Sequence, residues 1–239
     1  VWSVDWFEHK ENVVERIIKK LEDLKNTKVE KQPPLPTENN VLKTFSIENE
    51  PVVELVNNRE REYTFADLPN IGYSTDIDTV MASSYQVKKQ LQQIVKIEQP
   101  ITNTLLYKRI LRIWNLTRVT TRLQVFIDSL LEDAYKDPLS GDTIIYWEDK
   151  EKAKDCDFYR INSKRDILDI PILEVMSAAR YAIEQQISMP TEDLKRLTSQ
   201  LLGFSRKGNN LDMVTEHTIQ LLIDKGIFSH ANGMVSMNN

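Results

Sequence analysis

The fold is decided by the stretch from Thr102 to Leu131, which reads TNTLLYKRILRIWNLTRVTTRLQVFIDSLL. The Thr102 hydroxyl can cap a helix, and apolar residues then recur at helical spacing as far as Trp114. The pair Asn115-Leu116 predicts a tight turn, and we expect a second helix to begin at Thr117. The residues expected to face inward are Leu105, Leu106, Ile110, Ile113 and Trp114 in the first helix and Val119, Leu123, Phe126, Ile127, Leu130 and Leu131 in the second. The stretch therefore predicts two amphipathic helices joined by a short turn.

Two runs of strand-forming residues follow this pair of helices. They are Thr143–Trp147 and Phe158–Ile161, and a charged loop from Glu148 to Asp157 separates them. Such runs predict a β-hairpin with a long tip. Helix, turn, helix and hairpin, in this order, are typical of a winged-helix unit.

A weaker copy of the pattern lies 88 residues further along the chain. When Thr102–Leu123 is laid on Pro190–Leu211, Leu106 falls on Leu194 and Asn115 falls on Gly203. A glycine at that place suits the residue that ends a helix. We therefore predict a mainly α fold with small β-hairpins, of the α+β class, that contains tandem winged-helix or helix-turn-helix units.

The rest of the chain suggests four segments. We expect residues 1–32 to hold a short aromatic strand and an amphipathic helix, and residues 33–98 to hold a proline-bearing linker, an extended segment and a helix over 76–97. Residues 99–165 then form the winged-helix unit, and residues 166–239 form the second helix-turn-helix-like unit. Because the first residue is valine rather than methionine, we expect the chain to be part of a longer polypeptide.

Composition limits the classes of protein to which this chain can belong. Its 239 residues carry a formal net charge of −5, so any nucleic-acid binding has to come from a local basic patch. The single cysteine, Cys156, rules out a disulfide framework and a four-thiolate zinc site. No apolar run reaches the length of a membrane span, and no secretion signal opens the chain. We expect a cytoplasmic protein without a membrane partner.

A local basic patch does exist. No acidic residue occurs between Gln99 and Ile127, where five cations lie. On the second helix, guanidinium, hydroxyl and amide side chains fall away from the apolar stripe, as in a helix that contacts phosphates and base edges. The predicted nucleic-acid-binding residues are Lys108, Arg109, Arg112, Arg118, Thr121, Arg122 and Gln124. A solvated helix face or a protein-binding face remains the alternative.

The residues of common catalytic sites are not arranged for chemistry. The segment Gly203–Gly208 has the glycine spacing of a phosphate-binding loop, but Asn209-Asn210 stands where lysine and a hydroxyl residue are needed. The histidines are far apart in sequence, and Cys156 lies among acids that disfavour a thiolate. We expect no catalytic residue, no cofactor and no metal in this chain.

Three motifs resemble a known family. The run Ile97–Ile101 (IEQPI), the arginine-bearing helix after it, and Leu201–Arg206 (LLGFSR) together resemble the uncharacterised C-terminal domain of large bacterial helicases of the superfamily-one type. The opening Trp2–Phe7 (WSVDWF) resembles the last strand of the endonuclease-like domain, similar to very-short-patch-repair nucleases, that precedes it in such proteins.

The resemblance implies an accessory module rather than an enzyme. Its partners would be DNA and the helicase and nuclease-like domains of the same polypeptide, and an ATP-dependent motor would lie upstream. The alternative is a docking or structural tail of the helicase that makes no contact with DNA.

Overall fold

The computed structural model describes residues 57–73, 75–137, 143–161 and 163–238, together with Val14, Glu15, Ile18 and Lys19. The chain divides into two units, residues 1–57 and 58–239. In the first unit, Val14, Glu15, Ile18 and Lys19 are helical and exposed. The predicted strand Trp2–Phe7, the rest of the predicted helix over 10–25 and the proline-bearing linker lie outside the described residues.

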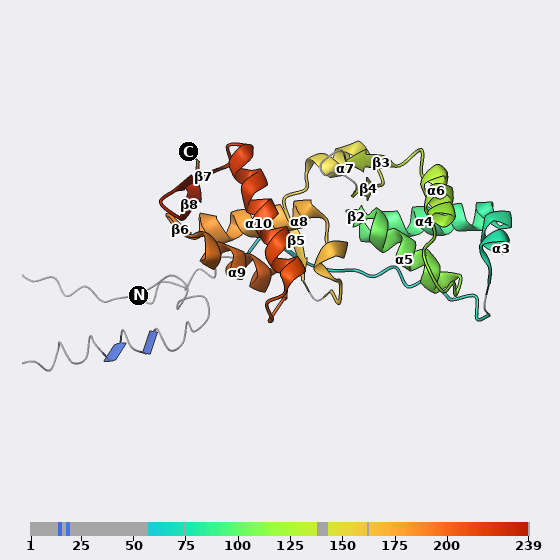
Figure 1. Cartoon of the computed structure of the whole chain (residues 1–239), viewed down its shortest axis with the longest axis horizontal. Helices are drawn as coiled ribbons and strands as arrows, with labels where there is room; N and C mark the ends of the chain where they lie inside the picture. Colours follow the sequence, from blue (N-terminus) through green and yellow to red (C-terminus); the bar gives the residue numbers. More distant parts are fainter. Residues whose placement is uncertain are drawn as a thin grey trace, which may run out of the picture. The chain divides into compact units, whose positions relative to one another are not determined.

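The second unit consists of short helices and small sheets (Figure 1). Its elements in chain order are β1 (Glu60–Glu62), α3 (Ile77–Ala82), α4 (Ser84–Glu98), β2 (Ile101–Thr102), α5 (Asn103–Ile113), α6 (Thr121–Leu130), β3 (Tyr135–Asp137), β4 (Ile145–Trp147), α7 (Lys150–Lys154), β5 (Tyr159–Ile161), the 3-10 turn η1 (Ile167–Asp169), α8 (Ile172–Glu184), β6 (Met189–Pro190), α9 (Thr191–Leu201), α10 (Asn209–Asp224), β7 (Phe228–Ala231) and β8 (Met234–Met237). This composition confirms the prediction of a mainly helical fold with small sheets. In the described residues, no helix combines the length and the apolar character needed to cross a bilayer.

The first predicted helix and the turn after it are confirmed. The Thr102 hydroxyl accepts a hydrogen bond from the Leu105 amide at 3.3 Å, which caps α5. The helix ends at Trp114, and Asn115 takes the left-handed conformation with φ of 48°. Asparagine tolerates this conformation better than most residues, which is why the chain turns here.

The second helix begins later than expected. The Thr120 hydroxyl accepts from the Leu123 amide at 3.2 Å and caps α6, so the helix starts at Thr121 and not at Thr117. Thr117 and Thr120 are both suitable capping residues, and helical spacing alone does not decide which of them caps the helix. As a result, Arg118 lies in the connecting segment rather than on the helix.

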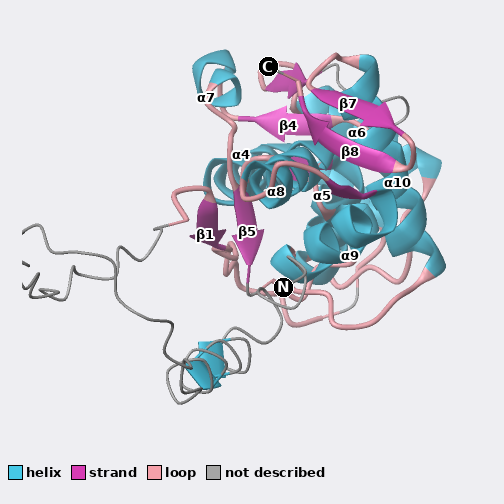
Figure 2. Cartoon of the chain, turned by 90° about the vertical axis from the view of Figure 1, so that its left-hand side faces the viewer, coloured by secondary structure: helices cyan, strands magenta, loops and turns pink. Residues whose placement is uncertain are grey.

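The predicted hairpin of Thr143–Trp147 with Phe158–Ile161 is wrong. Strand β4 pairs antiparallel with β3 and with β2, whereas β5 pairs in parallel with β1. Figure 2 shows β1 and β5 side by side, separate from β4. The physical reason is α7, whose capping residue Asp149 accepts from the Lys152 amide and which takes the charged segment out of the sheet. A strand-forming run of three residues contains no local pattern that specifies which strand it pairs with.

The internal repeat appears in the structure in exact register. A shift of 88 residues carries the first residues of α4, β2, α5 and α6 onto the first residues of α8, β6, α9 and α10. Each set continues with two strands, and the sheet orders β2-β4-β3 and β6-β8-β7 correspond. Gly203 is left-handed, with φ of 89°, at the position that matches Asn115. The two sets differ mainly in α10, which has 16 residues against 10 in α6.

Each repeat has its own apolar core. In the first, α4, α5 and α6 pack together around fully buried residues such as Leu106 and Ile110. In the second, α8, α9 and α10 pack around Ala179, Leu194 and Leu222. Burying one large aliphatic side chain contributes about 1.5–3 kcal/mol, so each core can hold its three helices without disulfides or metals.

Candidate nucleic-acid interface

The cations of α5 are engaged within the chain. Lys108 Nζ lies 2.7 Å from both carboxylate oxygens of Asp169. Arg109 donates to the fully buried Glu98 at 2.9–3.0 Å, and its guanidinium lies 4.4 Å from the centre of the Phe65 ring. The Arg112 guanidinium lies 4.8 Å from the centre of the same Phe65 ring. These three predicted site residues therefore hold neighbouring segments against α5.

Three of the four other predicted site residues are exposed at the start of α6 or in the segment just before it. Arg118, Thr121 and Arg122 are exposed, and Gln124 is half-buried. Arg122 makes an ion pair of 2.8 Å with Asp78, but the two side chains are 58% and 73% exposed. A pair this exposed is worth little in water and is screened by salt, so Arg122 can exchange Asp78 for another anion.

The half-buried carboxylate of Asp128 joins α6 to the rest of the first repeat. Asp128 accepts from the Tyr107 hydroxyl at 2.8 and 2.9 Å and from the Tyr146 hydroxyl at 2.8 Å. Burial and the Asp128 carboxylate raise the pKa of both phenols well above the ordinary value, so both stay protonated donors. The buried Leu123 and Ile127 of α6 belong to the same apolar core as Tyr107 and Tyr146. The start of α6 is thus presented on a rigid support.

Sequence reasoning missed the buried carboxylate Glu174. Arg160 and Arg165 donate to it at 2.5 and 2.8 Å. Arg160 also donates to the carbonyl oxygens of Glu98, Gln99 and Pro100 at 2.8, 3.2 and 2.6 Å. Burial alone would raise the pKa of Glu174, but the two guanidiniums outweigh burial and hold it below the ordinary value. No spacing in the sequence indicates these contacts, because they join residues up to 62 positions apart.

The segment around Tyr63 completes this network. The Tyr63 hydroxyl donates to Glu98 and accepts from Arg109 at 2.8 Å. Burial and the Glu98 carboxylate raise the pKa of Tyr63 to about 12. The Arg165 guanidinium lies 4.2 Å from the Tyr63 ring centre. The chain before α3 is therefore fastened to both repeats by charged and aromatic contacts.

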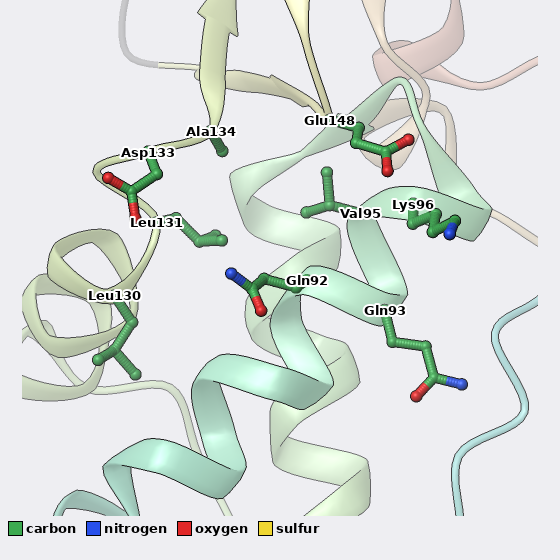
Figure 3. Close-up of a pocket in the computed structure, with 9 residues that line it drawn as sticks. All are labelled: Gln92, Gln93, Val95, Lys96, Leu130, Leu131, Asp133, Ala134 and Glu148. Atoms are coloured by element: carbon green, nitrogen blue, oxygen red, sulfur yellow. The ribbon is translucent and has the colours of Figure 1, made fainter.

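A hollow of about 450 Å³ lies at the other end of α6 (Figure 3). Helix α4 supplies one wall with Gln92 and Val95, and the end of α6 supplies the other with Leu130 and Leu131. Acidic and basic side chains also line the hollow, among them Glu148. Among the described residues, no three His, Cys, Asp or Glu side chains are placed to hold a metal ion.

Comparison with known proteins gives one match. The family model described as "Protein of unknown function (DUF3320)" matches residues 82–125, which run from the end of α3 through α4 and α5 into α6. The match covers less than a quarter of the chain. No curated protein matches the chain. No solved structure matches it either.

Proposed function

We propose that the chain is an accessory nucleic-acid-binding module of a bacterial helicase-like protein, built from two winged-helix units, and that DNA is its partner. The observation that carries this proposal is the exposed start of α6, with Arg118, Thr121 and Arg122. Each repeat has the order helix, strand, helix, helix, strand, strand, which is the order of a winged-helix unit, and α6 takes the place of the recognition helix.

One further finding supports the proposal. The matched family segment, residues 82–125, includes the run Ile97–Ile101 and the start of α6, which also carry the resemblance to helicase C-terminal domains. In this proposal the chain itself is not an enzyme, and the ATP-dependent motor and any nuclease belong to the upstream part of the polypeptide.

The chemistry at the start of α6 suits phosphate and base contacts. A guanidinium binds a phosphate or the edge of guanine through two parallel hydrogen bonds, and the positive end of the helix dipole adds to this attraction. Lys108 and Arg109 are occupied by Asp169 and Glu98, so we expect Arg118 and Arg122 to make most of the phosphate contacts.

The salt dependence of duplex binding tests how many phosphate contacts the chain makes. Five phosphate contacts would give a log–log slope of about −4 to −5, whereas two give about −2. Anisotropy of a fluorescent duplex, titrated with the chain at several salt concentrations, measures the slope. We expect Arg118→Ala and Arg122→Ala each to weaken binding and to reduce the slope by about 1.

Lys150→Ala is the matched control, because Lys150 is an exposed cation on α7. A binding constant that does not change with salt, or an equal loss in Lys150→Ala, would contradict the proposal.

The second candidate function is a protein-docking or structural tail of the helicase that never contacts DNA. It is favoured by the internal pairing of Lys108 and Arg109, which removes two cations from the predicted patch. Wild-type chain that binds no duplex even at low salt, while it remains folded, would support this candidate over the first.

A further inference from the structure

The outward face of α10 is exposed along most of the helix. Exposed residues recur along α10 at the spacing of one helix face, and we call this set the α10 stripe. It consists of Asn209, Asp212, Met213, Glu216, His217 and Gln220, which together line a shallow hollow of about 570 Å³. No residue of the stripe is a lysine or an arginine. Under the shift of 88 residues, Arg118 corresponds to Arg206, Arg122 to Asn210 and Gln124 to Asp212.

The stripe carries an excess of negative charge. Lys195 lies beneath it with its side chain 9% exposed and pairs with Asp212 at 3.2 Å, Glu216 at 3.8 Å and Glu192 at 3.2 Å. One buried ammonium group thus faces three carboxylates whose side chains are 63–79% exposed. The cations Arg206 and Lys207 precede the helix and line a hollow at its first turn together with Asp212, whereas Glu216 lies one turn further along. The middle of the stripe would repel a phosphate backbone.

An apolar side chain lies among these carboxylates. Met213 is 58% exposed, and the corresponding residue of the first repeat, Val125, is 65% exposed. Neither side chain contributes to the core of its repeat. Methionine adapts its shape to a partner, and an exposed apolar residue ringed by charges is typical of a surface that receives an amphipathic helix.

We propose that the α10 stripe docks a lysine- or arginine-bearing protein segment, whose apolar side chain packs on Met213 and whose cations pair with Asp212 and Glu216. Charge complementarity selects a basic protein segment over a nucleic acid, and Met213 supplies the contact that excludes water. This inference does not depend on the nucleic-acid proposal for α6.

A synthetic amphipathic peptide of leucine and lysine, labelled with a fluorophore, is the probe. Its binding to the whole chain is measured by anisotropy beside a peptide in which glutamate replaces every lysine. We expect the lysine peptide alone to bind. Met213→Ala, which leaves the net charge unchanged, should weaken binding about tenfold, and so should the double variant Asp212→Asn with Glu216→Gln.

Two matched controls separate a specific face from general attraction to an acidic protein. Val125→Ala removes the corresponding exposed side chain of α6, and Glu132→Gln with Asp133→Asn removes two other exposed carboxylates. Binding should not change in either control. The inference is overturned if the lysine peptide does not bind at about 100 µM chain, if the controls lose as much affinity as the stripe variants, or if the glutamate peptide binds equally well. It is also overturned if the stripe variants weaken duplex DNA binding instead of peptide binding.

Discussion

At the scale of single residues, we expect the stability of the fold to depend most on the carboxylate of Glu174. It is fully buried and is the shared counterion of two guanidiniums that are themselves buried, Arg160 and Arg165. Burying three charged groups is costly unless every one of them is paired, so the arrangement is stable only as a complete set. Loss of the single negative charge leaves two cations in a medium where water cannot solvate them.

We therefore expect Glu174→Gln to lower the free energy of unfolding by about 3–5 kcal/mol, measured by urea denaturation at neutral pH. The control is Glu151→Gln on α7, where an exposed pair with Lys154 should contribute less than about 1 kcal/mol. A loss in Glu174→Gln as small as that of the control would show that the buried network does not carry this free energy.

The pH dependence of the same variant has a definite sign. The pKa of Glu174 is lowered in the folded state, so its contribution is fully present above its ordinary pKa of 4.5 and is lost as pH falls through the folded pKa. The stability difference between wild type and Glu174→Gln should be constant at neutral pH and shrink below about pH 4.5. Urea denaturation at a series of acidic pH values measures it, and a difference that grows toward low pH would contradict the assignment.

At the scale of elements, the corresponding helices α5 and α9 of the two repeats end in the same way. Asn115 follows α5 and Gly203 follows α9, and both take left-handed backbone angles. A Cβ added at Gly203 would meet nothing within 4 Å, so any cost of a side chain there comes from the backbone alone. This makes Gly203 a clean test of what the turn requires.

We expect Gly203→Ala to reduce the free energy of unfolding by about 1–2 kcal/mol, because an L-residue is strained in the left-handed region. Thermal or urea denaturation measures the change. Ser205→Ala, an exposed position in the same connecting segment, should have almost no effect. A neutral Gly203→Ala would mean that the turn relaxes to another conformation.

At the scale of the whole second unit, Arg160 links the two repeats. It lies on β5, pairs with Glu174 of α8 and donates to three carbonyl oxygens where α4 ends. The apolar core of the first repeat is a cluster separate from those of the second, so we expect this network to contribute to the coupling between the repeats, together with the Lys108–Asp169 pair.

We predict that Arg160→Lys uncouples the unfolding of the two repeats. A lysine ammonium cannot replace a planar guanidinium that reaches a carboxylate and three carbonyls at once, and we expect a loss of about 2–4 kcal/mol. Native-state hydrogen exchange in low urea should then give different opening free energies for α5 and α9, whereas we expect equal values in the wild type. Lys164→Arg, at an exposed position of the same segment, should leave the two equal.

The site was predicted only in part, for a physical reason. The basic composition of residues 99–127 is evident in the sequence, and so is the outward position of Arg122 on its helix. Which cations remain available was decided by acids on other elements, namely Glu98, Asp169 and Asp78. The α10 stripe could have been found from its helical spacing, because Asp212, Met213 and Glu216 fall opposite the apolar positions.

The sequence by itself determined the capped helix α5, its turn at Asn115 and the 88-residue repeat, because caps, turns and helical spacing depend on residues within a few positions of one another. Only the tertiary structure decided that β4 pairs with β3 and β2, that β5 pairs with β1, and that Arg160 reaches Glu174. Strand pairing and charge pairing join segments far apart in the chain, and their free energy depends on which surfaces the helices have already brought together.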